Sequence, residues 1–186
     1  MILLAFGVLV TALMHLVAAV PPLKARVKAM TGEKAYGPMF GLASLLGIAI
    51  IVLGWRASSF VPVYDPPEWG WYATLILTLI AFIFLGIFIF RGSWRQRLRF
   101  PMAFAAIFWS VGHLLGNGDL ASLILFGGFL AYALAHLALG FANGVRPSPE
   151  VRAGHNLLSV LIGIALYGIM AQLHGALIGV PLVQLG

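Results

Sequence analysis

Six long apolar runs, separated by shorter polar segments, divide the chain of 186 residues. An α-helix rises about 1.5 Å per residue, so roughly twenty apolar residues cross a hydrocarbon layer of about 30 Å. The fourth run is the shortest, and the others approach or exceed this length. The pattern therefore predicts an all-α bundle of about six transmembrane helices over Ile2–Val20, Tyr36–Trp55, Trp71–Phe90, Pro101–Leu115, Leu120–Phe141 and Leu157–Val180.

Prolines and polar segments indicate where these helices end. Pro21 and Pro22 are expected to end the first helix, because proline lacks the amide hydrogen that a continuing helix needs. Pro101 is expected to begin the fourth helix, since proline is favoured in a first turn. The segments Leu23–Ala35 and Arg56–Gly70 are predicted to be connecting loops. A cleaved signal peptide is the alternative for the first run, but no lysine or arginine precedes that run.

Composition and charge support a membrane protein and indicate its orientation. Hydrophobic residues make up 62% of the chain and charged residues only 9%, whereas soluble domains carry about 25% charge. All lysines and arginines except Arg56 follow the first, third or fifth predicted helix. The positive-inside rule then places these loops in the cytoplasm and both termini outside it. The net charge of +6 is expected to meet the lipid bilayer rather than nucleic acid.

The residue types present exclude several classes of catalytic and metal-binding site. Cysteine is absent, which excludes disulfides, thiolate catalysis, Fe–S clusters and covalently attached haem. No hydrolase triad, paired carboxylate site or phosphate-binding glycine loop is visible. Histidine and carboxylate are the strong metal ligands that remain. Several histidines on helices of a membrane bundle are compatible with b-type haem bound through imidazole.

Ionisable side chains inside a membrane are candidates for a functional site, because burying them in hydrocarbon costs free energy. Four histidines fall within predicted helices, and a fifth, His155, falls in a polar loop where solvation is expected. The competing interpretation for each helical histidine is simple packing with one hydrogen bond. The candidates are His15, His113 with Trp109 and Asn117 one turn away, His136, and, as the weakest, His174.

Several segments match the pattern of a known family. They are His15, Thr31-Gly32-Glu33-Lys34-Ala35-Tyr36, Arg99-Phe100-Pro101, the run from Trp109 through Ser110-Val111-Gly112-His113 to Asn117-Gly118-Asp119, and Leu125-Phe126-Gly127-Gly128. On these residues the chain resembles the NnrU family, which includes the plant 15-cis-zeta-carotene isomerases. One departure is that the family usually has Arg-His-Pro where this chain has Phe100 as the middle residue.

The resemblance implies a single domain over residues 1–186 in the bacterial inner membrane, associated with denitrification. It also implies a b-type haem bound by two histidines, which look like His15 and His113. The cofactor-site candidates are thus His15, His113, His136, Trp109 and Asn117, with His15 and His113 as the metal ligands. The missing histidine at Phe100 leaves a ligand role for His113 untouched.

A count of residues along the helices bears on the pairing of these histidines. His15 lies about 8 Å above the cytoplasmic end of its helix and His113 about 18 Å above the end of its own. Two axial ligands of one iron should lie at similar depths. His136 matches the depth of His15 better and is the alternative partner.

Three functions remain open from the sequence. The first is a haem protein that responds to redox state or to nitric oxide, since filled axial positions suit electron transfer or sensing. The second is a haem-dependent cis-trans isomerase that acts on a polyene such as zeta-carotene. The third is a cofactor-free factor for assembly or transport beside a reductase. Whether the chain is an enzyme is left open at this stage.

Overall fold

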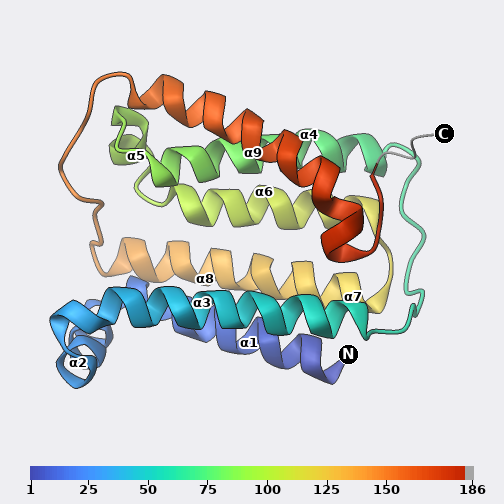
Figure 1. The fold of residues 1–186 in the computed structure, drawn as a ribbon, viewed down its shortest axis with the longest axis horizontal. Helices are drawn as coiled ribbons and strands as arrows, with labels where there is room; N and C mark the ends of the chain where they lie inside the picture. The colour runs from blue at the N-terminus through green and yellow to red at the C-terminus, as the bar shows by residue number, and fades with distance from the viewer. Residues whose placement is uncertain (183–186) are drawn as a thin grey trace.

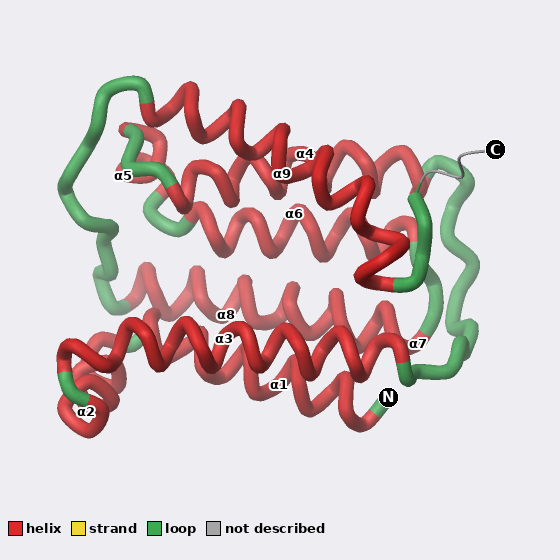
Figure 2. Tube along the Cα trace, in the orientation of Figure 1, coloured by secondary structure: helices red, strands yellow, loops and turns green. Residues whose placement is uncertain are grey.

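The computed structural model, which describes residues 1–182, is built from helices joined by turns and loops (Figure 1, Figure 2). Five helical stretches are long and apolar enough to cross a membrane, and Pro101–Gly116 is a shorter apolar helix beside them. The prediction of an all-helical membrane bundle is therefore confirmed, with a count near the predicted six. The elements are α1 (Ile2–Leu16), η1 (Val17–Ala19), α2 (Pro21–Thr31), α3 (Glu33–Arg56), α4 (Gly70–Ile89), α5 (Ser93–Leu98), α6 (Pro101–Gly116), α7 (Leu120–Ser122), η2 (Leu123–Gly127), α8 (Gly128–Ala142) and α9 (His155–Ile178).

Two short helices were not predicted. The segment Leu23–Ala35, expected to be a loop, is mostly helical: α2 starts with two prolines in its first turn and ends at Gly32, whose φ of 86° suits glycine. The six-residue helix α5 follows α4. Both carry several basic residues and lie at the same end of the bundle (Figure 1). Neither contains a long apolar run, so the hydrophobic pattern did not reveal them.

The long helices form two groups that run roughly along a common axis (Figure 1). α4 packs against α6 and α9 in one group, and α1 packs against α3 in the other. α8 contacts both α6 and α1, so it joins the two groups. The first helix of the chain and the last ones therefore contribute to a single bundle.

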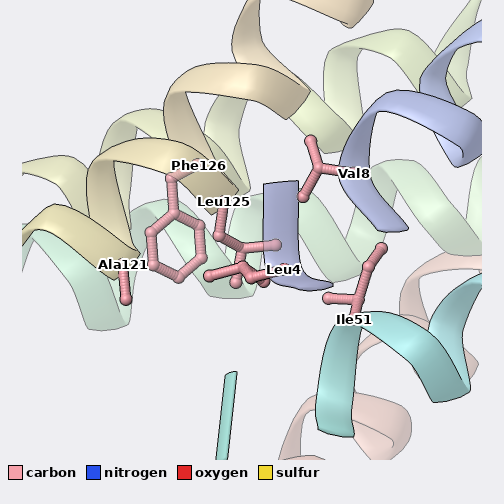
Figure 3. Close-up of a cluster of buried hydrophobic side chains, with 6 residues drawn as sticks. All are labelled: Leu4, Val8, Ile51, Ala121, Leu125 and Phe126. Atoms are coloured by element: carbon pink, nitrogen blue, oxygen red, sulfur yellow. The ribbon is translucent and has the colours of Figure 1, made fainter. Parts of the chain in front are cut away.

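Two clusters of buried side chains mark two levels along this bundle. The Phe126 cluster consists of Leu4, Val8, Ile51, Ala121, Leu125 and Phe126 (Figure 3). The Phe100 cluster consists of Phe100, Ala103, Tyr132 and Ala133. Phe100 lies beside the start of α6, next to the basic helix α5, whereas Phe126 belongs to the turn region that follows the end of α6. Contact with one cluster or the other therefore shows how far along the bundle axis each histidine lies.

The loop between α3 and α4 is tied to the turn between α6 and α7. The backbone amides of Val63 and Tyr64 both donate to the carbonyl of Gly118, at 2.8 and 3.0 Å. A side chain at Gly118 would run into the carbonyl oxygen of Tyr64, so this close approach requires glycine. Asp119 caps α7 by accepting a hydrogen bond from the amide of Ser122 at 3.0 Å. These contacts fix the turn that follows His113.

Candidate functional site

His113 lies near the end of α6 in a fixed orientation. Its Nδ1 is 2.8 Å from the carbonyl oxygen of Trp109. A carbonyl can only accept, so Nδ1 carries the hydrogen and the lone pair of the imidazole lies on Nε2. The ring stacks on Phe126 with centroids 4.4 Å apart and planes 21° apart. A histidine held in this way has the arrangement typical of a metal ligand, in which the second nitrogen donates to a carbonyl.

The imidazole of His113 forms part of the wall of a largely apolar cavity between α3, α4, α6 and α9. The cavity encloses about 890 Å³ of empty space, including its open mouth. Five aromatic side chains line it: Trp55, Phe82, Trp109, Phe126 and Tyr167. Apolar walls with a few polar groups are typical of sites for small organic ligands and cofactors.

Trp109 and Asn117, the two expected neighbours of His113, both line this cavity. The Trp109 ring lies 5.3 Å from the His113 ring and 4.8 Å from that of Phe126, measured between centroids. The amide Nδ2 of Asn117 donates to the backbone carbonyl of His113 at 2.8 Å. Trp109, one helical turn before His113, therefore helps to orient the imidazole. Asn117 satisfies the carbonyl of His113, which lies in the last turn of α6 and has no partner within the helix.

The hydroxyl of Tyr64 reinforces this end of α6. It lies 2.7 Å from the backbone carbonyl oxygen of Asn117 and also contacts that of Leu114, so it donates to the last turn of the helix. Burial raises the pKa of the Tyr64 phenol, and the nearby negative charge of Asp119 raises it further. The phenol is therefore held in its neutral, donating form.

His15 has the same donor arrangement in a different place. Its Nδ1 is 2.8 Å from the carbonyl oxygen of Thr11, which again leaves the lone pair on Nε2. The ring meets Phe40 and Tyr132 edge to face, with centroids 5.0 and 6.0 Å apart. Tyr132 belongs to the Phe100 cluster, so His15 lies at the level of that cluster.

His136 lies beside His15. Its ring contacts Tyr132 and Phe100 edge to face, each with centroids 5.8 Å apart. Its buried Nδ1 has no hydrogen-bond partner among the described residues. His15 and His136 thus share one aromatic neighbour, in line with the similar depths that the residue count gave them.

The structure does not bring His15 and His113 together. Phe100, at the level of His15, precedes His113 by thirteen residues, which corresponds to about 20 Å along α6. Between the two imidazoles lie the rings of Trp109, Phe129 and Tyr132, in successive edge contacts. The cavity of His113 has no lining residue from α1.

The histidine that shares the cavity with His113 is His174 of α9. His174 was the weakest of the helical candidates because it lies near the end of the last helix, and the packing of α9 against α4 places it here. His155 differs from all the others: its Nδ1 accepts a hydrogen bond from the amide of Arg91 at 3.1 Å. Its proton therefore lies on Nε2, and no free lone pair is left for a metal.

Within residues 1–182, no group of three or more histidine, aspartate or glutamate side chains is arranged to hold a metal ion. The site is instead built from single imidazoles set in aromatic walls. The fold and this site define a multi-pass helical membrane protein with a histidine on the wall of an apolar cavity. The sequence model described as NnrU protein matches residues 3–182, and the chain belongs to the NnrU family. No curated protein and no solved structure matches it.

Proposed function

We propose that this NnrU-family protein binds a b-type haem in the bacterial inner membrane, with His113 as an axial ligand. The observation that carries the proposal is the hydrogen bond from His113 Nδ1 to the carbonyl of Trp109, which leaves Nε2 free at the wall of an apolar cavity. Imidazole is a common axial ligand of haem iron, and a hydrogen-bonded second nitrogen is its usual support.

The residues around His113 fit such a group. The rings of Trp109 and Phe126 both pack against the imidazole, and these contacts favour its orientation toward the cavity. Most other lining side chains are apolar, which suits a flat hydrophobic macrocycle. Bound haem supplies one-electron redox chemistry and, when an axial position is open, a site for nitric oxide.

We propose that the haem protein acts in denitrification, the reduction of nitrite and nitric oxide, and that it responds to redox state or to nitric oxide. Family membership is the support for this role. The apolar cavity also supports a second candidate, a haem-dependent cis-trans isomerase that receives a polyene from the bilayer. Haem binding is the step that both candidates share, so it is tested first.

The test is a reduced-minus-oxidised absorbance spectrum of protein purified in detergent from haem-replete cells. The wild-type protein should show a b-type spectrum, and His113→Ala should lose the haem or its axial ligand. Free imidazole added to His113→Ala should restore the ligand, because the substitution leaves a hole of the same shape. His155→Ala is the matched control, since that imidazole has no free lone pair.

Colourless wild-type protein would overturn the proposal and favour a cofactor-free role in assembly or transport. A haem spectrum that is identical in the wild type and in His113→Ala would overturn the ligand assignment alone. For the isomerase candidate, the wild-type protein would be expressed in cells that accumulate a poly-cis carotene. Pigments unchanged by the protein would count against that candidate and leave haem binding standing.

A further inference from the structure

The connection between α5 and α6 contains a strained backbone turn at Arg99. The amide of Phe100 donates a hydrogen bond to the carbonyl of Leu98 at 2.7 Å, which closes a three-residue turn around Arg99. The φ and ψ angles of Arg99 are 62° and −48°, close to those of the rare γ-turn with positive φ. Among residues 1–182, no other residue except glycine has a positive φ. Such strain is concentrated at functional sites, so the side chain that this turn positions is a candidate for a function.

The turn holds the guanidinium of Arg99 over two aromatic rings. Its Cζ lies 4.7 Å from the ring centroid of Phe141 and 5.4 Å from that of Phe100. These two rings meet edge to face, with centroids 4.9 Å apart. Phe100 packs closely against α8 because residue 140 is glycine, where a side-chain carbon would lie 2.7 Å from the ring. The guanidinium therefore rests on a platform whose position is fixed by the packing of α6 against α8.

Most of the hydrogen-bonding capacity of Arg99 is unused. A guanidinium has about five N–H donors. Within residues 1–182, Nη2 donates to the backbone carbonyl of Val145 at 2.9 Å, whereas Nε is buried and has no partner. A buried donor without a partner costs free energy, so such a group is normally satisfied by water or by a ligand. Arg99 therefore has donors left for an acceptor oxygen from outside the chain.

The positive charge of Arg99 is not neutralised either. The ion pairs found among the residues that the structure describes involve neither Arg99 nor Arg146. Arg146 directly follows Val145, whose carbonyl accepts from Arg99. Desolvation lowers the pKa of the Arg99 guanidinium, and the positive charge of Arg146 lowers it further. Two like charges held close together without a carboxylate favour the binding of an anion beside them.

The surroundings of this arginine pair indicate that the anion belongs to a lipid. Arg99 lies where α6 begins and α8 ends, at the end of the bundle that carries the basic helices α2 and α5 (Figure 1). An exposed apolar stripe runs along α8 away from the guanidinium, and consists of Phe141, Ala138, Leu134 and Ala131. These positions are three or four residues apart and so share one side of the helix. Acyl chains can lie against this stripe, whereas a soluble phosphate compound would leave it uncovered.

We propose that Arg99 and Arg146 form a binding site for the phosphate of one anionic glycerophospholipid, whose acyl chains lie along the exposed stripe of α8. A phosphate accepts two parallel hydrogen bonds from a guanidinium, which uses donors that the chain leaves free. An anionic lipid fits better than a zwitterionic one, because the ammonium group of the latter would be brought close to two unpaired positive charges. This site is separate from the cavity of His113 and does not depend on haem.

The experiment measures lipid binding to the purified full chain in detergent by native mass spectrometry. The wild type should bind one molecule of phosphatidylglycerol more tightly than phosphatidylethanolamine. Arg99→Gln should weaken phosphatidylglycerol binding by about tenfold, the loss expected for a charge-assisted hydrogen bond. Arg99→Lys should recover only part of this affinity, because an ammonium group lacks the planar fork. Arg97→Gln is the matched control, since it removes an exposed arginine two residues away, and should weaken binding by less than about twofold.

Arg146→Gln is the second variant, because Arg146 is exposed and its replacement leaves the turn at Arg99 intact. It should also weaken phosphatidylglycerol binding, and wild-type affinity in this variant would overturn the paired site. Equal losses in Arg97→Gln and Arg99→Gln would mean that the lipid responds to total charge alone, which also overturns the inference. Equal affinity for the two lipids would exclude selection of an anionic headgroup. Displacement of phosphatidylglycerol by an equal concentration of glycerol 3-phosphate would identify a soluble phosphate compound, and not a lipid, as the ligand.

Discussion

The imidazole of His113 and the phenyl ring of Phe126 lie nearly face to face, 4.4 Å apart between centroids. The π-helical turn η2 carries Phe126 and widens the helix by one residue at this point. Such turns inside α-helices are frequent at functional sites. The same ring also belongs to the buried cluster that joins α1, α3 and η2 (Figure 3). One side chain thus serves both the packing of the bundle and the orientation of the candidate ligand.

Replacement of Phe126 should therefore affect stability and ligation together. We expect Phe126→Ala to lower the free energy of unfolding by about 3–5 kcal/mol, because it opens a cavity in the core. Haem that remains bound should show a broadened mixture of low-spin signals, since the His113 ring gains freedom. Thermal unfolding in detergent and electron paramagnetic resonance measure the two effects.

Phe6 provides the matched control for this substitution, because it lies on α1 with 54% of its surface exposed. Phe6→Ala should change the free energy of unfolding by less than about 0.5 kcal/mol. Equal losses in the two variants would mean that Phe126 has no special place in the core.

Two threonines one turn apart on α4 should differ in how their replacement by valine changes the free energy of unfolding. The hydroxyl of Thr74 lies 2.7 Å from the carbonyl of Gly112 and so links α4 to α6, whereas the hydroxyl of Thr78 has no partner within residues 1–182. Thr74→Val should cost about 0.6 kcal/mol, the average for hydrogen bonds between membrane helices. Thr78→Val should be neutral or stabilising in haem-free protein, because it removes an unsatisfied hydroxyl. Unfolding of both variants in detergent measures the two effects, and a loss of stability in Thr78→Val equal to that in Thr74→Val would contradict the prediction.

Tyr64 should make the stability depend on pH at the alkaline end. The folded protein raises the pKa of this phenol, through burial first and the charge of Asp119 second. The unfolded chain therefore ionises first, near pH 10. The stabilisation by the neutral phenol is complete below that pH and is lost as the pH rises through the folded-state pKa. Tyr64→Phe should be about 0.5–1.5 kcal/mol less stable than the wild type at pH 8, and this difference should disappear at high pH. A difference that is constant with pH would exclude this role for the hydroxyl.

Apolar runs predicted the long helices well, because a membrane span depends on a property that each segment carries by itself. The predicted run Leu120–Phe141 corresponds to α7, η2 and α8, which together cover Leu120–Ala142. The short helices α2 and α5 escaped prediction because neither contains a long apolar run. The π-helical turn at Leu123–Gly127 has no marker in the sequence that could have been used.

The candidate site was predictable only in part. Trp109 and Asn117 follow from helical periodicity, since each lies one turn from His113 along the chain, and both line its cavity. The neighbours of His113 on other helices depend on which helices pack together, and periodicity carries no such information. His174 is the clearest case, because α9 reaches the cavity only through its contact with α4. The depth count along each helix was the one signal that argued against pairing His15 with His113.

The orientation in the membrane stays a prediction, and the absence of cysteine makes it simple to test. The basic loops are expected in the cytoplasm, because the membrane potential and anionic lipids retain positive charge there. Ser148→Cys, in the basic loop before α9, should react with a membrane-impermeant maleimide only after the membrane is permeabilised. Ser59→Cys, in the loop between α3 and α4, should react in spheroplasts with an intact inner membrane. Both serines are exposed, so accessibility within the protein is matched. The opposite labelling pattern would place the N-terminus and the end of α6 that carries His113 on the cytoplasmic side.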